Sequence, residues 1–77
     1  MTAKDTIEIG SLTMHRDADC SRYAGRAGEL TVSAIRMGTG WYARAMARQY
    51  VAEGEGRTAT EATQRAVGPE SRWEAKR

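Results

Sequence analysis

The strongest constraint on this chain is a pair of glycines that leads directly into a helix start, in Gly54-Glu55-Gly56-Arg57-Thr58-Ala59-Thr60-Glu61-Ala62. Glycine weakens the interior of a strand, and Thr-x-x-Glu is typical of a helix N-terminus. The Thr58 hydroxyl can accept from the N–H of Glu61, and the Glu61 carboxylate can reach back to the N–H of Thr58. The sequence therefore predicts a strand ending here and a helix over residues 58–67, terminated by Gly68-Pro69.

The size of the chain limits its core. Its 77 residues are near the length at which one core suffices without a disulfide, a metal or a partner subunit. Much of its 40% hydrophobic content is alanine, and it has no phenylalanine. We expect a single domain over residues 1–77 with a charged C-terminal tail from about residue 68. A core this thin favours burial against a second copy, as a homodimer, or against a larger assembly.

The hydropathy pattern in the first half of the chain predicts one strand followed by one loop. Apolar and polar residues alternate over residues 6–15, with a change of parity at Gly10-Ser11, which indicates one bulged strand. Residues 16–29 are polar and contain two glycines, which predicts a loop, with a short strand near Tyr23 as the alternative.

A hairpin is predicted in the middle of the chain. Residues 30–37 form its first strand, which ends at Gly38-Thr39-Gly40, a three-residue turn signal, and Trp41 begins the returning strand. With the helix packed on one face, the fold class is α+β, with a small antiparallel sheet of three or four strands. The competing interpretation is a helix over residues 41–53, because Ala-Arg-Ala-Met-Ala-Arg-Gln has high helix propensity.

The hairpin register assigns side chains to two faces. If Met37 faces Trp41 across the turn, alternate positions share a core face. These core positions are Ile35, Met37, Trp41, Ala43 and Ala45. The opposite face then carries Arg36, Tyr42, Arg44 and Arg48. In the tail, Trp73 is expected to dock on the sheet.

No recognisable catalytic or metal-binding pattern is present. The lone histidine, His15, precedes Asp17, Asp19 and Cys20, but this spacing matches no zinc motif, and no third group orients a thiolate pair. A single cysteine excludes an internal disulfide and agrees with a reducing compartment. We therefore predict a protein that is not an enzyme and has no catalytic residue, no metal and no cofactor.

Charge and hydropathy narrow the partners and the compartment. The formal net charge of +2 and the pI of about 9.0 are too mildly basic for affinity that rests on bulk phosphate neutralisation. The start of the chain has no apolar leader segment, and no stretch approaches membrane-spanning length. We expect no membrane association and a cytoplasmic location, in the host cytoplasm if the protein is phage-encoded.

Interleaved arginines and tyrosines are the best candidates for function. Such residues stack on bases and contact phosphates, and they are also enriched at protein interfaces. The predicted partner-binding residues are Arg36, Tyr42, Arg44, Arg48, Tyr50 and Arg57. Their chemistry fits a protein or nucleoprotein partner, or direct nucleic-acid binding.

The strand-to-helix stretch resembles two families. From Gly40-Trp41-Tyr42-Ala43 through the glycine pair to Ala62, it looks like the strand–helix half of a double-stranded RNA-binding domain, with Ala59 and Thr60 at the positions of that family's phosphate-binding lysines. The same residues resemble HicB-like antitoxins, in which a Gly-Trp/Tyr-x-Ala strand leads through Gly-x-Thr-x-x-Glu-Ala into a helix. Either resemblance implies a nucleic-acid-binding module of RNA-binding or antitoxin type.

The organisation of the whole chain is similar to that of the small phage-encoded anti-CRISPR proteins. The similarity lies in length, a hairpin and one short helix. It implies a non-enzymatic phage inhibitor that blocks a host protein or nucleoprotein complex, such as a type I CRISPR surveillance complex. The nucleic-acid-binding module is the alternative function.

Overall fold

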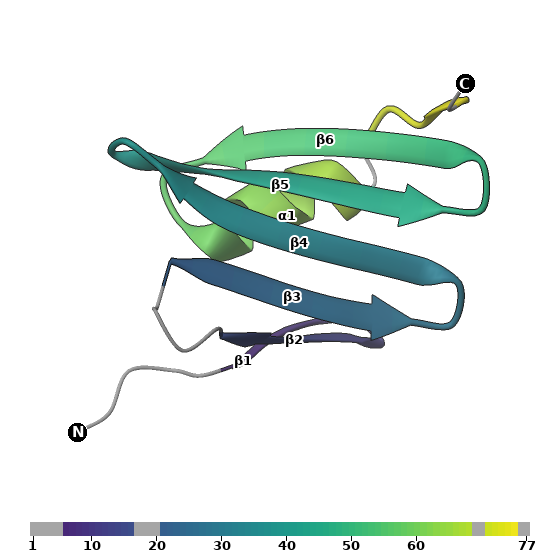
Figure 1. Cartoon of the computed structure of the whole chain (residues 1–77), viewed down its shortest axis with the longest axis horizontal. Coiled ribbons are helices and arrows are strands. Elements are labelled where there is room, and N and C mark those ends of the chain that lie inside the picture. The colour runs from purple at the N-terminus through teal and green to yellow at the C-terminus, as the bar shows by residue number, and fades with distance from the viewer. Residues whose placement is uncertain (1–5, 17–20, 69–70, 76–77) are drawn as a thin grey trace.

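A single antiparallel sheet with one helix on one face makes up the computed structural model, which describes residues 6–16, 21–68 and 71–75 (Figure 1). The seven strands follow one another in the sheet in chain order. The elements are β1 (Thr6–Ile9), β2 (Leu12–Arg16), β3 (Arg22–Ala27), β4 (Leu30–Met37), β5 (Gly40–Ala47), β6 (Tyr50–Gly56), α1 (Ala59–Val67) and β7 (Glu74–Ala75). Each strand therefore pairs with its neighbours along the chain, and α1 follows the sixth strand.

Two-residue turns join four of the strand pairs. Each turn begins with a residue of positive φ: Gly10 (61°), Gly28 (62°), Gly38 (63°) and Arg48 (55°). A positive φ at the first turn position suits the right-handed twist of a hairpin, and glycine adopts it without steric cost. Gly28, Gly38 and Arg48 follow one another at intervals of ten residues. Because each interval holds one two-residue turn and one strand, β4 and β5 have the same length.

The prediction of three or four strands is wrong, because the described sheet has seven. Residues 6–15 are not one bulged strand but the β1–β2 hairpin, turning at Gly10-Ser11. The short strand suggested near Tyr23 is present and is longer than expected: β3 occupies much of the predicted loop over 16–29 and pairs along its length with β4. Its inward position opposite Met14 is Gly25, where a Cβ atom would collide with the main chain of Thr13. A strand without an apolar residue there escapes detection by hydropathy.

The alternative helix over residues 41–53 does not form, since this segment is β5, a turn and the start of β6. The predicted hairpin is present, but its turn is Gly38-Thr39, and Met37 pairs with Gly40. This register shifts β4 by one position relative to the predicted one. Trp41, Ala43 and Ala45 do face the helix, whereas Ile35 pairs with Tyr42 on the opposite face.

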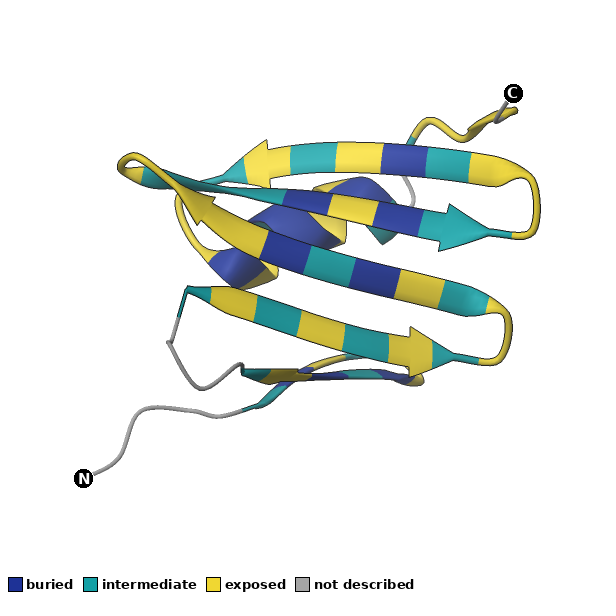
Figure 2. Cartoon of the chain, in the orientation of Figure 1, coloured by how far each residue is buried: buried dark blue, intermediate teal, exposed yellow. Residues whose placement is uncertain are grey.

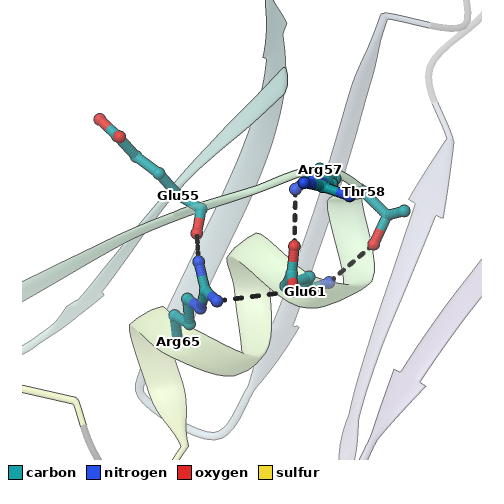
Figure 3. A network of polar contacts seen from close by, with 5 residues as sticks. All are labelled: Glu55, Arg57, Thr58, Glu61 and Arg65. Atoms are coloured by element: carbon teal, nitrogen blue, oxygen red, sulfur yellow. Dashed lines mark hydrogen bonds and ion pairs between the residues drawn. The ribbon is translucent and has the colours of Figure 1, made fainter. Parts of the chain in front are cut away.

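The helix begins where the sequence predicts. Thr58 is its N-cap, and the Thr58 hydroxyl accepts from the N–H of Glu61 at 3.0 Å (Figure 3). The Glu61 carboxylate accepts from the N–H of Arg57 at 2.7 Å, not from that of Thr58. At the other end, the N–H of Gly68 donates to the carbonyl of Gln64 at 2.7 Å, and Pro69 lies outside the described residues. The capping pair thus fixes where the chain leaves the sheet.

Small residues bring α1 close to β4, β5 and β6, which lie in front of it in Figure 1. A Cβ atom at Gly54 would lie 2.6 Å from the main chain of both Ala62 and Ala66. The buried positions of β4 and β5 are Val32, Ala34, Ala43 and Ala45, which appear as dark bands in Figure 2. The helix therefore lies almost directly on the backbone of the sheet.

The larger buried side chains come from the N-terminal hairpin. Ile7, Leu12 and Met14 join the helix-side core, and Met14 is fully buried. The Thr63 hydroxyl, on α1, donates to the Met14 sulfur at 3.6 Å. Tyr23 and Trp41 add a tilted ring contact, with centroids 5.7 Å apart. The core thus lies between the β1–β2 hairpin, the central strands of the sheet and α1.

Candidate functional site

The face of the sheet turned away from α1 is the candidate binding surface. We call it the open face and define it by the side chains of β3 to β6 that point away from the helix. The strand registers arrange them in three rows across the sheet. The rows are Arg22, Ile35, Tyr42 and Glu55; Ala24, Ser33, Arg44 and Glu53; and Arg26, Thr31, Met46 and Val51.

Large apolar side chains lie at two places on the open face. Ile35 is 38% exposed and Met37, at the end of β4, is 58% exposed. Ile35 pairs with Tyr42, and Met46 pairs with Val51 beyond the row of Ser33 and Arg44. A solvated sheet face normally carries polar side chains, so these apolar residues mark a surface suited to a partner.

Charge changes sign across the open face. Arg22 and Arg26 lie on β3 and Arg44 on β5, whereas Glu53 and Glu55 lie on β6. All five residues are exposed. On this face β3 is therefore basic and β6 acidic, with Arg44 directly opposite Glu53 between them. This uneven charge favours a partner docked in one orientation.

Tyr42 is held in place within this surface. Burial raises the pKa of the Tyr42 phenol, and a hydrogen bond to Glu53 and the charge of that carboxylate raise it further. The Arg44 guanidinium acts in the opposite direction on the same pKa, and Glu55 adds to the rise. Tyr42 is therefore a neutral hydrogen-bond donor at neutral pH, oriented by Glu53.

The structure does not bring the six predicted binding residues onto one face. Tyr42 and Arg44 share the open face. Arg36 pairs directly with Trp41 and therefore points to the helix side of the sheet, at the exposed end of β4. Tyr50 pairs with Ala47 at the start of β6, which also places it on the helix side. The shifted register of β4 and the β5–β6 turn cause both differences.

The other two predicted residues lie in connections. Arg48 begins the β5–β6 turn, and its Nε donates to both carboxylate oxygens of Glu29 in the β3–β4 turn, at 2.7 and 3.0 Å. This pair is largely exposed, so it contributes little to stability. Arg57 lies between β6 and α1, where its main-chain N–H belongs to the helix cap.

Sequence reasoning missed several residues of the open face. Ile35 and Met37 were assigned to the core, and Arg22 and Arg26 fell in the predicted loop. The signal that could have found them is the ten-residue spacing of Gly28, Gly38 and Arg48, which marks strands of equal length joined by two-residue turns. Trp73, expected to dock on the sheet, is 38% exposed.

The residues around His15, which match no metal-binding pattern in the sequence, lie mostly outside the described part of the chain. His15 lies on β2 with an exposed side chain, while Asp17, Asp19 and Cys20 lie outside the described residues. Within residues 6–16, 21–68 and 71–75, no group of three or more His, Cys, Asp or Glu side chains is placed to hold a metal ion. In the same ranges, no helix has the length and apolar character needed to cross a membrane.

Comparisons with known proteins add no relative. A scan against protein-family models gave no match, and neither did searches of curated proteins and of solved structures. The argument for function therefore rests on the geometry of the open face.

Proposed function

We propose that this chain is a non-enzymatic binding protein that docks a partner protein on its open face. One observation carries the proposal: Ile35, Tyr42 and Met46 on β4 and β5 point away from the helix, whereas Ala34, Ala43 and Ala45 on the same strands point toward it. These larger side chains are not part of the core cluster, so the open face is available for a partner. Its tyrosine, methionines and arginines are residue types enriched at protein interfaces.

The anti-CRISPR resemblance suggests one specific form of this function. In that form the open face covers a surface of a host protein or nucleoprotein complex, for example a type I CRISPR surveillance complex, and blocks its access to other molecules. A small rigid sheet suits such a role, because little ordering of the binder accompanies association.

Paired substitutions test the proposal. Tyr42→Ala with Arg44→Ala removes two adjacent open-face side chains, and we expect partner binding to fall about thirtyfold or more, as for central contact residues. The matched control, Arg36→Ala with Arg48→Ala, removes two arginines that the structure places off this face, and it should bind like the wild type. The measurement is recovery of the partner on immobilised protein, followed by titration. Equal losses in both double variants would contradict the open-face assignment.

Direct nucleic-acid binding through the same face is the second candidate. Arg22, Arg26 and Arg44 lie on the same face as Tyr42, and an aromatic residue on a sheet can stack on a base. Glu53 and Glu55 repel phosphate on the other side, which favours the protein partner. Titration of the isolated protein with single-stranded RNA at two salt concentrations separates the candidates, since phosphate contacts make affinity fall steeply with salt.

A further inference from the structure

One edge of the sheet is only partly covered. β6 pairs with β5 over its whole length, but on its other side only Tyr50 and Val51 pair, with β7. From Ala52 to Gly56 no strand among the described residues lies against this edge. An uncovered strand offers unpaired N–H and C=O groups to any extended segment that approaches.

The hairpin geometry shows which groups point outward. Ala47 and Tyr50 flank the two-residue turn, so they form a hydrogen-bonded pair, and such pairs alternate along an antiparallel hairpin. The main-chain groups of Glu53 and Glu55 therefore point away from β5. The structure agrees, because the Arg65 guanidinium on α1 donates to the Glu55 carbonyl at 2.8 Å (Figure 3).

Surface hollows follow the same edge. Three of them adjoin consecutive parts of β6 and together extend from residue 51 to residue 57. The first is lined by Tyr42, Glu53, Gly54, Glu55 and Arg65; the second by Glu55, Gly56, Arg57, Glu61 and Arg65; the third by Val51, Ala52, Glu53, Arg72 and Glu74. We call these three hollows together the edge groove.

The charge along the groove indicates what it accepts. Among the described residues, the carboxylates of Glu53, Glu55 and Glu74 form no ion pair, and the Glu53 carboxylate accepts only the Tyr42 hydroxyl. On the helix side, Arg65 is already engaged with the Glu55 carbonyl and with the Glu61 carboxylate. Four glutamates and three arginines line the three hollows, and the two carboxylates on the outward-bonding residues, Glu53 and Glu55, form no ion pair among the described residues. This small excess of negative charge beside an open strand favours a basic segment over nucleic acid.

The tail of this chain already demonstrates strand addition at this edge. β7 runs antiparallel to β6, with Glu74 opposite Val51. Two residues further along this register, Arg72 would lie opposite Glu53, and both residues line the same hollow. The chain thus shows that a strand fits at one end of the edge, and that a cation and Glu53 line the hollow next to it.

We propose that the free edge of β6 binds an extended basic segment of a partner protein, which adds to the sheet as a further strand along Ala52–Gly56. Its main chain bonds to the outward groups of Glu53 and Glu55, and lysines or arginines at alternate positions face the two carboxylates. Arg65 leaves the Glu55 carbonyl and keeps Glu61 as its partner.

A second copy of this chain fits the edge poorly. If two β6 edges paired antiparallel about Gly54, Glu53 of each copy would lie opposite Glu55 of the other. Like charges directly opposite each other destabilise a strand pair. The basic partner segment is therefore the occupant that the groove favours. This proposal goes beyond the open-face function, because it depends on the main chain of β6.

The probe is a capped peptide of about seven residues, a usual strand length, with lysine and valine in alternation. We expect it to bind, to shift the backbone amide resonances of residues 52–56, and to protect the amides of Glu53 and Glu55 from hydrogen exchange. N-methylation of alternate peptide amides on one edge should abolish binding, and N-methylation on the other edge should leave it intact. A peptide with glutamate in place of lysine should not bind.

Protein variants give a second readout. Glu53→Gln with Glu55→Gln should weaken peptide binding about fivefold or more and reduce its salt dependence, since exposed ion pairs contribute modestly each. The matched control is Glu8→Gln, which removes an exposed carboxylate on β1, far from β6, and should bind like the wild type.

Three results would overturn the proposal. The first is no binding at a peptide concentration of about 1 mM, which would detect even a weak complex. The others are equal tolerance of N-methylation on either edge of the peptide, and resonance shifts confined to the side chains of the open face. The edge proposal and the open-face proposal can be refuted independently of each other. Ile35→Ala with Met37→Ala removes open-face side chains on β4 that line none of the three hollows. This variant should still bind the peptide, even if it loses the open-face partner.

Discussion

The two faces of the same sheet differ in the size of their side chains. On the helix side, the central strands carry Ala34, Ala43, Ala45, Ala52 and Gly54. On the open side, the same strands carry Ile35, Tyr42, Arg44, Met46 and Val51. In most small domains the large apolar residues are inside. Here small residues set the close approach of the helix, and the larger side chains of these strands are left for contacts outside the core.

This arrangement makes the core depend on the N-terminal hairpin. Alanine and glycine bury little area each, and of the larger buried side chains Ile7, Leu12 and Met14 come from the hairpin, whereas Val32 comes from the central strands. The hairpin is therefore needed for stability even though the site proposed for function lies on β3 to β6. The predictions below compare helix-side and open-face positions.

The largest effect is expected for Met14→Ala. Met14 is fully buried beneath α1, and its truncation leaves a cavity between the hairpin and the helix. We expect the free energy of unfolding to fall by about 3 kcal/mol, measured by urea denaturation. The control is Met46→Ala on the open face, which should cost about 1 kcal/mol or less. Equal losses for the two methionines would show that the open face is buried in solution.

A neighbouring pair on β4 tests the size rule directly. Ala34→Leu forces a larger side chain between the sheet and α1 and should destabilise the protein by about 2 kcal/mol through overpacking. Ile35→Ala, one residue along and on the other face, should change stability by about 1 kcal/mol or less. Thermal denaturation of both variants measures the difference. The reverse order would mean that the predicted hairpin register, with Ile35 in the core, is right after all.

The sequence could predict part of this arrangement. The Thr58 cap, the helix that follows it and the inward-facing Trp41, Ala43 and Ala45 were all readable, because they depend on local hydrogen bonding and on alternation. The number of strands was not readable from hydropathy. Gly25 takes the place of an apolar residue within β3, so this strand lacks the usual alternation. Arg48 occupies a turn position that usually carries glycine, so the β5–β6 turn is not marked in the usual way.

The candidate site was only partly predictable for a related reason. A one-residue difference in the length of the Gly38-Thr39 turn moves every side chain of β4 to the other face. That single difference took Arg36 off the open face and put Ile35 on it. The edge groove depends on where β7 stops, which no local pattern in the tail reveals.

The smallest effect concerns the titration of Tyr42. Its pKa lies above the ordinary value of 10.0, so the folded protein holds this proton more tightly than the unfolded chain does. The resulting contribution to stability is complete below pH 10 and is lost as the pH rises through the folded pKa.

Glu53→Gln removes the carboxylate and should lower the pKa of Tyr42, whereas Arg44→Ala removes the opposing cation and should raise it further. Phenolate absorbance, taken as the difference from Tyr42→Phe, follows this group alone among the three tyrosines. Shifts of opposite sign would show that the three side chains interact on one face, as the register requires; shifts of the same sign would separate Tyr42 from Glu53 and remove the ordered centre from the open face.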